Sequence, residues 1–396
     1  MPVPHHDPVV IVSAQRSPLG ALQGALSPVT AVEMCSQVVK SCLTALPPAA
    51  QVGEALIGCV LSAGLGQAPA RQVVLGAGLP YSTLATTVNK ICGSGLQTVI
   101  IAHNVLLAGT SQIVVAGGME SMTHAPHLLL KSRSGYRLGH GELVDHLLLD
   151  GLEDPHHHRQ LMGEFAEDMV QEYHFSREMQ DAHALRSFTR ARKAVSDHAF
   201  VKEIAPISWK EKTEEVVFSQ DEIPFKADLE RIPTLRPSFR EGGTITAASA
   251  SAIADGAAAC ILMKESTAHA LGVSPRARIV AQAGFAQAPQ HFITAPVGAI
   301  RLALERAGWS TEEVDLYEIN EAFAAAVMIA TQELKLDVDK VNVHGGACAL
   351  GHPLGASGTR ILVTLLHALE RSHLKKGVAS LCVGGGEAVA LAIERL

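Results

Sequence analysis

The sequence predicts an α/β protein in which a mostly parallel sheet is covered by helices on both faces. Short apolar runs alternate with longer segments whose apolar residues recur at helical spacing. This strand–helix–strand rhythm is typical of layered α/β folds. With 396 residues, 47% of them hydrophobic, the chain can bury large cores. Its 34 glycines and 4% aromatic content favour closely packed elements joined by tight turns.

The expected elements follow in chain order. Apolar runs predict strands at Val9–Val12, Glu54–Val60, Ile113–Ala116, Ala277–Ala283 and Ser380–Val383. Helical spacing predicts helices at Thr30–Ala45, Gly95–Leu107, Pro296–Ala307, Glu321–Leu334 and Ser357–Arg371. Another helix should begin after Ser176, whose hydroxyl can cap it, although Met179 three residues later rules out a full capping box.

The pattern also suggests an internal duplication. Gly93–Gln97, a helix and Ile113–Gly118 form one unit of glycine turn, helix, buried strand and paired glycine. Gly355–Arg360, a helix and Ser380–Gly385 repeat it. Between these units, roughly residues 119–248 are rich in charge and histidine. A segment of that kind, inserted between rigid halves, is expected to cover a ligand.

Composition excludes several functional classes. The net charge is −7 and no long basic block occurs, so nucleic-acid or acidic-membrane binding is not expected. Seven cysteines without a Cys-x-x-Cys pair indicate reduced thiols. The strand starting at Val9 leaves no room for a leader, and apolar runs of membrane-spanning length are interrupted by charge or glycine. We therefore expect a cytosolic protein.

No metal site is expected either. The run His156–His158 lies among charged residues beside Pro155 and lacks helical ligand spacing, so it is interpreted as a solvated loop.

Cys92 is the main candidate for chemistry. It stands in Val88–Gln97, where an apolar run meets a glycine turn and then a helical pattern. The free N–H groups at a helix start favour a thiolate over a thiol. Gly93 and Gly95 leave space around the sulfur for a substrate carbonyl. Taken alone, Cys92 could equally be a buried cysteine beside a turn.

Two later segments change that balance. Gly345–Gly358 presents His352 and Leu381–Ala388 presents Cys382, each on a glycine-rich loop with free N–H donors. A nucleophile, a base, a second thiol and N–H donors together are equipment for acyl transfer. Individually, His352 could be a hydrogen-bonded loop histidine and Cys382 a small core residue at a strand end.

In these segments the chain resembles the thiolase family. The Cys92 turn, Asn-Glu-Ala-Phe-Ala at 320–324 and both glycine loops match it, as do residues 9–20 and 114–122. The similarity covers nearly the whole chain and looks greatest to the cytosolic acetoacetyl-CoA thiolases. It implies a five-layered αβαβα fold of two similar halves. The implied boundaries are 1–118 plus 249–271 for the first half, 119–248 for a loop domain that holds coenzyme A, and 272–396 for the second half.

The resemblance also implies a reaction, the reversible condensation of two acetyl-CoA to acetoacetyl-CoA and CoA. Cys92 would carry the acetyl group, His352 would be its base, and Cys382 would exchange the α-proton. A thiolate suits that last step better than an ordinary carboxylate because its reference pKa is higher. Asn320 would hold a water that, with His352, forms one oxyanion hole, unless it only caps the next helix. The N–H groups of Cys92 and Gly384 would form the other.

The remaining expectations concern ligands and assembly. The family pocket maps onto a set of small, apolar and basic residues: Met162, Lys226, Phe239, Ser251, Ala322 and Phe323. Phe239 and Phe323 would leave little space beyond a two-carbon acyl unit. Coenzyme A thioesters are expected as substrates, with no tightly bound cofactor. The resemblance implies a homotetramer.

This chain departs from the family pattern near the coenzyme A site. Leu161, Phe225 and Ser249 stand where histidine, arginine and asparagine are usual, and Glu387 replaces a methionine. A carboxylate at 387, if buried beside Cys382, would raise the pKa of that thiol. Three hypotheses remain: an active acetoacetyl-CoA thiolase, a thiolase-fold enzyme with shifted acyl preference or low turnover, and a non-catalytic acyl-CoA-binding protein.

Overall fold

A ten-stranded sheet runs through both halves of the protein in the computed structural model, which describes residues 7–396. The first half has the order β4-β3-β5-β12-β1, and the second has β13-β16-β15-β14. They join where β1 and β13 pair at Val10↔Arg278 and Ile11↔Ala277. The strands are β1 (Val9–Arg16), β2 (Gly20–Ala21, on β12), β3 (Glu54–Gly58), β4 (Leu84–Val88), β5 (Ile113–Ser121), β12 (Ala254–Lys264), β13 (Ala277–Ala286), β14 (Leu316–Ile319), β15 (Lys376–Val383) and β16 (Glu387–Arg395).

The expectation of a mostly parallel sheet is wrong. The pairs β3–β4, β3–β5 and β14–β15 are parallel, whereas β1–β12, β12–β5, β1–β13, β13–β16 and β15–β16 are antiparallel. For the pair β15–β16 the antiparallel direction has a local cause. A tight glycine turn joins β15 directly to β16, and a short turn can connect only antiparallel neighbours.

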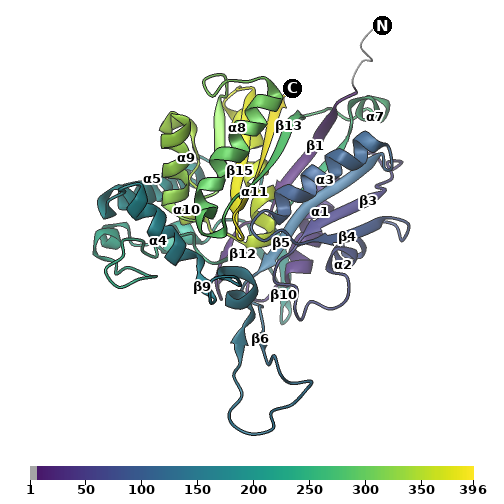
Figure 1. The fold of residues 1–396 in the computed structure, drawn as a ribbon. Helices are drawn as coiled ribbons and strands as arrows, with labels where there is room; N and C mark the ends of the chain where they lie inside the picture. The colour runs from purple at the N-terminus through teal and green to yellow at the C-terminus, as the bar shows by residue number, and fades with distance from the viewer. Residues whose placement is uncertain (1–6) are drawn as a thin grey trace.

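The helices form three layers around the two half-sheets (Figure 1). On the outer face of the first half lie α1 (Ala31–Leu43), α2 (Pro69–Gly76) and α7 (Glu265–Ala270). Between the halves lie α3 (Ser94–Ala108) and α11 (Leu354–Arg371), which pack on each other and on strands of both halves. On the outer face of the second half lie α8 (Ala295–Ala307) and α9 (Ala324–Leu334). The predicted five-layered αβαβα fold is thus confirmed.

Glycine makes the central layer possible. A Cβ at Gly95 on α3 would lie 2.8 Å from the backbone nitrogen of Thr359 on α11 and 2.9 Å from the carbonyl oxygen of Gly355. A Cβ at Gly358 would lie 2.3 Å from the backbone nitrogen of Leu96. The first turns of the two helices therefore touch through their backbones, which a larger residue prevents.

α3 is also the one helix in the described chain long and apolar enough to cross a membrane, counted over Ile91–Ala108. It packs against β3, β5 and α11, so its composition is that of a core helix between two sheets.

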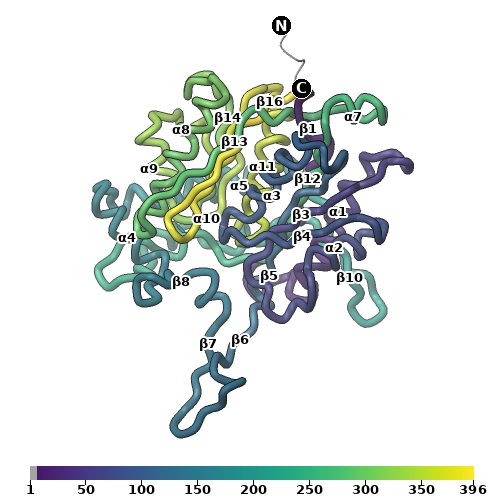
Figure 2. Tube along the Cα trace, turned by 45° about the vertical axis from the view of Figure 1, so that its right-hand side comes forward, coloured from purple at the N-terminus to yellow at the C-terminus, as the bar shows by residue number. Residues whose placement is uncertain are grey.

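The inserted segment between β5 and β12 covers one end of the sheets (Figure 2). Its elements are β6 (His127–Leu128), β7 (Val144–Asp145), η1 (Leu148–Leu152), β8 (Glu153–Asp154), β9 (Gln160–Leu161), α4 (Met162–Glu172), α5 (Arg177–Ser196), β10 (Ile207–Glu211), β11 (Glu214–Phe218), α6 (Ile223–Lys226) and η2 (Leu229–Thr234). The Ser176 cap on α5 is confirmed, because its Oγ accepts from the N–H of Met179 at 3.3 Å. The His156–His158 run lies in the turn between β8 and β9. Elsewhere in the chain there are short helices, η3 (Pro289–Thr294), η4 (Val338–Lys340) and α10 (Ala347–Leu350).

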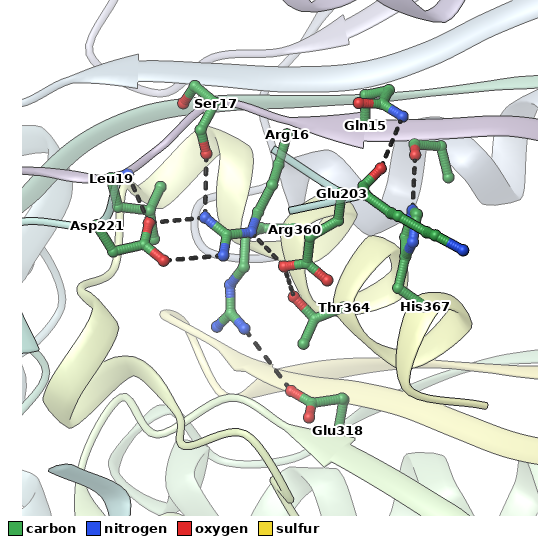
Figure 3. Close-up of polar contacts among 12 residues, drawn as sticks. Gln15, Arg16, Ser17, Leu19, Glu203, Asp221, Glu318, Arg360, Thr364 and His367 are labelled. Carbon is green, nitrogen blue, oxygen red and sulfur yellow. Dashed lines mark hydrogen bonds and ion pairs between the residues drawn. The ribbon is translucent and has the colours of Figure 1, made fainter. Parts of the chain in front are cut away.

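A buried charge cluster ties this segment to the first half (Figure 3). Arg16 on β1 donates to both carboxylate oxygens of Asp221, at 2.7 and 2.9 Å, and through Nε to Glu203 at 2.5 Å. All three side chains are fully or almost fully buried. Since removing one partner would leave a buried charge unpaired, the cluster holds the chain on both sides of the β10–β11 hairpin against β1.

The first test concerns the glycine contact. Gly95→Ala should destabilise the protein by about 2 kcal/mol or more, because the added methyl must push α3 and α11 apart. Thermal unfolding should show a fall of several degrees. Gly284→Ala on β13 is the control, since its Cβ would find nothing nearer than 3.9 Å, and it should leave the melting temperature nearly unchanged. Equal effects of the two changes would contradict the analysis.

Candidate active site

The predicted reactive residues stand at the ends of elements that the two halves bring together. Cys92 precedes α3, His352 precedes α11, Asn320 follows β14, and Cys382 lies near the end of β15. Gly384 begins the turn from β15 to β16. The duplicated units thus each contribute a loop to one region.

The Cys92 turn is strained at a residue that the sequence did not single out. Ile91 has φ of +46°, which is unfavourable for a β-branched residue. The turn is held by hydrogen bonds from the N–H of Gly93 to the carbonyl of Lys90 (3.0 Å) and from the N–H of Lys90 to Ser94 Oγ (2.8 Å). The sequence suggested that Gly93 leaves space around the sulfur. The structure adds another reason for glycine, because a Cβ at position 93 would lie 2.7 Å from the Val383 side chain. The glycines permit close packing and do not merely clear space around the sulfur.

The pKa of Cys92 corrects a second expectation. Burial raises it to about 11, although hydrogen bonds from the backbone N–H groups of Gly384 and of Cys92 itself act to lower it. The predicted N–H groups are therefore present, but desolvation of the thiol outweighs their effect on its pKa. Their arrangement around the sulfur is consistent with the predicted oxyanion donors, Cys92 and Gly384.

His352 is buried and held in one tautomer. Its Nδ1 lies 2.5 Å from Ser357 Oγ, and that hydroxyl donates to the carbonyl of Pro353 at 2.9 Å. Because the hydroxyl proton is used, Ser357 must accept from Nδ1–H, which leaves Nε2 unprotonated and free to act as a base. Burial, with Arg360 nearby, lowers the pKa of His352 to about 3, so the imidazole is neutral.

Asn320 faces His352 and not the following helix. Its Nδ2 lies 3.4 Å from His352 Nε2, and its buried Oδ1 has no hydrogen-bond partner. An unpartnered buried oxygen is suited to hold a water. The alternative of Asn320 as a helix cap is wrong, because α9 begins at Ala324 after Phe323.

Cys382 is fully buried, and burial together with nearby Cys92 raises the pKa of its thiol. Glu387 is not buried beside Cys382, contrary to one possibility raised by the sequence. Glu387 is 41% exposed and forms an ion pair with Lys90 of the nucleophile turn. Its carboxylate is thus balanced by a cation.

A cavity of about 570 Å³ adjoins these groups. His352 lines it, as do all six predicted ligand residues: Met162, Lys226, Phe239, Ser251, Ala322 and Phe323. Cys92 packs in the apolar cluster of Met122, Leu148 and Leu152, which line the same cavity. The rings of Phe239 and Phe323 meet edge to face with centroids 5.7 Å apart. The space fits an elongated, mostly apolar ligand that ends near the two thiols.

The residues that differ from the family pattern are accommodated by local contacts. Leu161 lines the cavity, whereas Phe225 is about half exposed outside its lining. Lys226 pairs with Glu222 at 2.5 Å. Buried Ser249 accepts from the N–H of Thr246 at 2.9 Å and so fixes the loop before Ser251.

Comparison with known proteins agrees with this geometry. Residues 9–266 match the thiolase N-terminal domain and residues 273–395 match the thiolase C-terminal domain. The chain belongs to the thiolase family. It is 47% identical to an acetyl-CoA acetyltransferase of Escherichia coli over 98% of this chain and 99% of the relative. A cytosolic acetyl-CoA acetyltransferase of Mus musculus is also 47% identical, over 98% of both chains.

Solved thiolase structures superpose closely on this one. An acetyl-CoA acetyltransferase of Bacillus anthracis has a TM-score of 0.95 at 44% identity, covering 98% of this chain and 99% of that one. A thiolase of Ascaris suum in complex with coenzyme A has a TM-score of 0.92 at 40% identity, covering 98% of this chain and all of that one.

Sequence reasoning missed the residues that hold this thiolase site in place. Ser357, which fixes the tautomer of His352, follows it five residues later in the same glycine-rich segment, Gly345–Gly358. Glu120 accepts from the N–H groups of Val60, Leu61 and Gly355 at 2.9–3.1 Å, and burial raises its pKa to about 7. Glu120 could have been found from the sequence, because it is a single carboxylate within a mostly apolar strand.

Glu321 has a similar role behind Asn320. Burial would raise its pKa, but hydrogen bonds from His183, Ser187 and the N–H of Cys348 lower it to about 2.

The pKa values predict how the free enzyme meets an alkylating agent. With the pKa of Cys92 near 11 and that of His352 near 3, neither group is charged at pH 7. The rate of iodoacetamide modification of Cys92, located by mass spectrometry, should therefore rise from pH 7 to pH 10 without a plateau. A plateau between pH 5 and 8 would instead mean a thiolate–imidazolium pair and would contradict the analysis.

Proposed function

We propose that this thiolase reversibly condenses two molecules of acetyl-CoA to acetoacetyl-CoA and CoA. The proposal is supported by the apolar cavity that His352 lines, with Asn320 beside His352, and by Cys92, which packs on the cavity's apolar lining and lies near Cys382. The relatives at 45–47% identity that bear the name acetyl-CoA acetyltransferase support the choice of substrate. We also propose a cytosolic location and a role in lipid metabolism, as the cytosolic mouse relative suggests.

In the first step the Cys92 sulfur attacks the thioester carbonyl of acetyl-CoA. His352 Nε2 takes the thiol proton and returns it to the sulfur of departing CoA. The negative oxygen of the tetrahedral intermediate is stabilised by the N–H groups of Cys92 and Gly384. The product is an acetyl-cysteine.

In the second step Cys382 gives its thiol proton to His352 Nε2 and, as thiolate, removes a proton from the methyl carbon of a second acetyl-CoA. The enolate oxygen is stabilised by the Nε2–H that His352 has gained and by a water held by Asn320. The carbanion carbon bonds to the acetyl carbon on Cys92 and expels the Cys92 thiolate, giving acetoacetyl-CoA. The Cys92 thiolate takes the proton from His352 Nε2, Cys382 keeps the α-proton as a thiol, and thiolysis is the reverse.

A shifted acyl preference is the second candidate. Leu161, in place of the usual histidine, adds an apolar side chain to a lining that already contains Leu148 and Leu152. Turnover of 3-ketohexanoyl-CoA at a kcat/KM above that of acetoacetyl-CoA would favour it. The non-catalytic hypothesis has less support, since all four reacting side chains are present and the base is held in a usable tautomer.

Labelling with radioactive acetyl-CoA tests the roles of the two thiols. Cys92→Ser should abolish the acetyl-enzyme, because the nucleophile is lost. Cys382→Ala should keep stoichiometric labelling yet lose about 10³-fold or more of condensation and thiolysis, because only the proton transfer is removed. Cys260→Ala, a buried cysteine of the core, is the control and should behave as wild type. Persistent labelling of Cys92→Ser would refute the assignment.

We further propose that the protein assembles as a homotetramer. Two exposed apolar features support assembly. The edge strand β4 leaves one side unpaired, with Leu84 67% exposed. The arm between β6 and β7 projects from the body and exposes Leu130 and Leu138 (Figure 2). Exposed leucines on a projecting arm are typical of a contact surface.

Replacing both arm leucines, Leu130→Glu with Leu138→Glu, should convert the tetramer to a dimer, because charges oppose burial of the arm. Mass measurement by light scattering during gel filtration checks this. Val201→Glu, an equally exposed apolar residue elsewhere, should leave the mass unchanged. A wild-type monomer would overturn the proposal.

A further inference from the structure

The two catalytic loops interlock at three points. Val383 packs where a side chain on Gly93 would lie, and Ile91 packs on Gly384, whose Cβ would be 3.5 Å from the isoleucine methyl. The third point is the ion pair from Lys90 Nζ to Glu387 Oε2. This ion pair links the nucleophile turn to the β15–β16 turn, beside the hydrogen bond from the N–H of Gly384 to the Cys92 sulfur.

The location of the pair gives it more effect than an ordinary surface ion pair. Lys90 is two residues before Cys92 and adjoins the strained Ile91. Glu387 is paired across the β-hairpin with Val383, next to the Cys382↔Ala388 pair. The ion pair therefore joins the two backbone segments whose N–H groups, of Cys92 and Gly384, bind the Cys92 sulfur.

The polar and charged groups around the Lys90–Glu387 ion pair form two sets. The pair lines a second cavity, of about 400 Å³, together with Gln97, Gln282 and Arg306. Arg306 is engaged with the carbonyl of Gln282, and the Gln282 side chain bridges to His103 and Asn104. Toward the sulfurs the other titratable groups are Glu120 and His352. Lys90 is two residues from Cys92, and Glu387 lies opposite Val383, the residue after Cys382, so an unbalanced charge at either position would stand near the segments that carry the thiols.

We propose that Lys90 and Glu387 are positioning residues, whose ion pair holds the Cys92 turn against Gly384 and cancels charge beside the catalytic thiols. The proposal rests on the function proposed above for its kinetic test, but its thiol-reactivity test does not. It also explains how this chain accommodates glutamate at position 387, where the family pattern has methionine.

Charge removal from either side tests the proposal, because a purely structural role cannot give opposite signs. In Glu387→Gln the unpaired Lys90 cation favours thiolates, so the alkaline rise of iodoacetamide modification at Cys92 should move down by about half a pH unit. In Lys90→Met the unpaired Glu387 carboxylate should move it up by about as much. The charge swap, Lys90→Glu with Glu387→Lys, should return the profile to that of wild type.

Thiolysis of acetoacetyl-CoA provides the second readout. Each single variant should lose about two- to fivefold in kcat with KM nearly unchanged, and the swap should recover most of the loss. Glu313→Gln is the matched control: its ion pair with Lys376 has the same residue types and similar exposure (25% and 51%, against 26% and 41%) but lies at the other end of β15. It should change neither readout.

The outcomes are distinct. Profile shifts of the same sign, no shift, or a swap that restores nothing would overturn the proposal. If wild type cleaves no acetoacetyl-CoA, the proposed function fails, while opposite shifts in thiol reactivity would still support the pair. Melting temperatures of all variants, expected within a few degrees of wild type, separate positioning from loss of fold.

Discussion

Backbone contact between the first turns of α3 and α11 is the constraint on which the site depends. Gly95 and Gly355 let the two helix starts approach more closely than any side chain would allow. Cys92 and His352 each precede one of these helices, so the same contact sets the distance between the proposed nucleophile and the proposed base. The fold thereby builds the site at the junction of two similar units, where each contributes one loop. The close packing of the central layer is therefore also what positions the residues of the candidate site.

Buried carboxylates then fix the loops around that junction. Glu120 accepts from N–H groups on both sides of it, including that of Gly355. Glu321 binds the inserted segment through His183 and Ser187. A loop carries backbone groups that must be satisfied when buried, and a carboxylate can accept several of them at once. These interactions hold irregular backbone in a fixed position close to the substrate cavity, so the site can be preorganised although it is made of loops.

The sequence predicted the layers well and the direction of the strands in the sheet poorly. Periodicity locates elements such as α3 and β5 within a few residues, because it reports which face is buried. It carries no information on strand direction, which depends on connections such as the β15–β16 turn. Motifs singled out Cys92, Cys382 and His352, whose catalytic roles stay predictions, and the position of Cys92 at a helix start predicted the wrong sign for the shift of its pKa. Desolvation depends on every atom packed around the sulfur, and no local pattern contains it.

The raised pKa of Cys92 and the lowered pKa of His352 have a common chemical meaning. A thiolate–imidazolium pair is disfavoured, because both charges would form in a desolvated place. The N–H groups of Cys92 and Gly384, which donate to the Cys92 sulfur, are the donors proposed to stabilise the oxygen of a bound thioester. Proton transfer to His352 is therefore best coupled to attack on a bound thioester. Such a site limits reaction of the free thiol with other electrophiles and reserves its electrostatic stabilisation for the transition state.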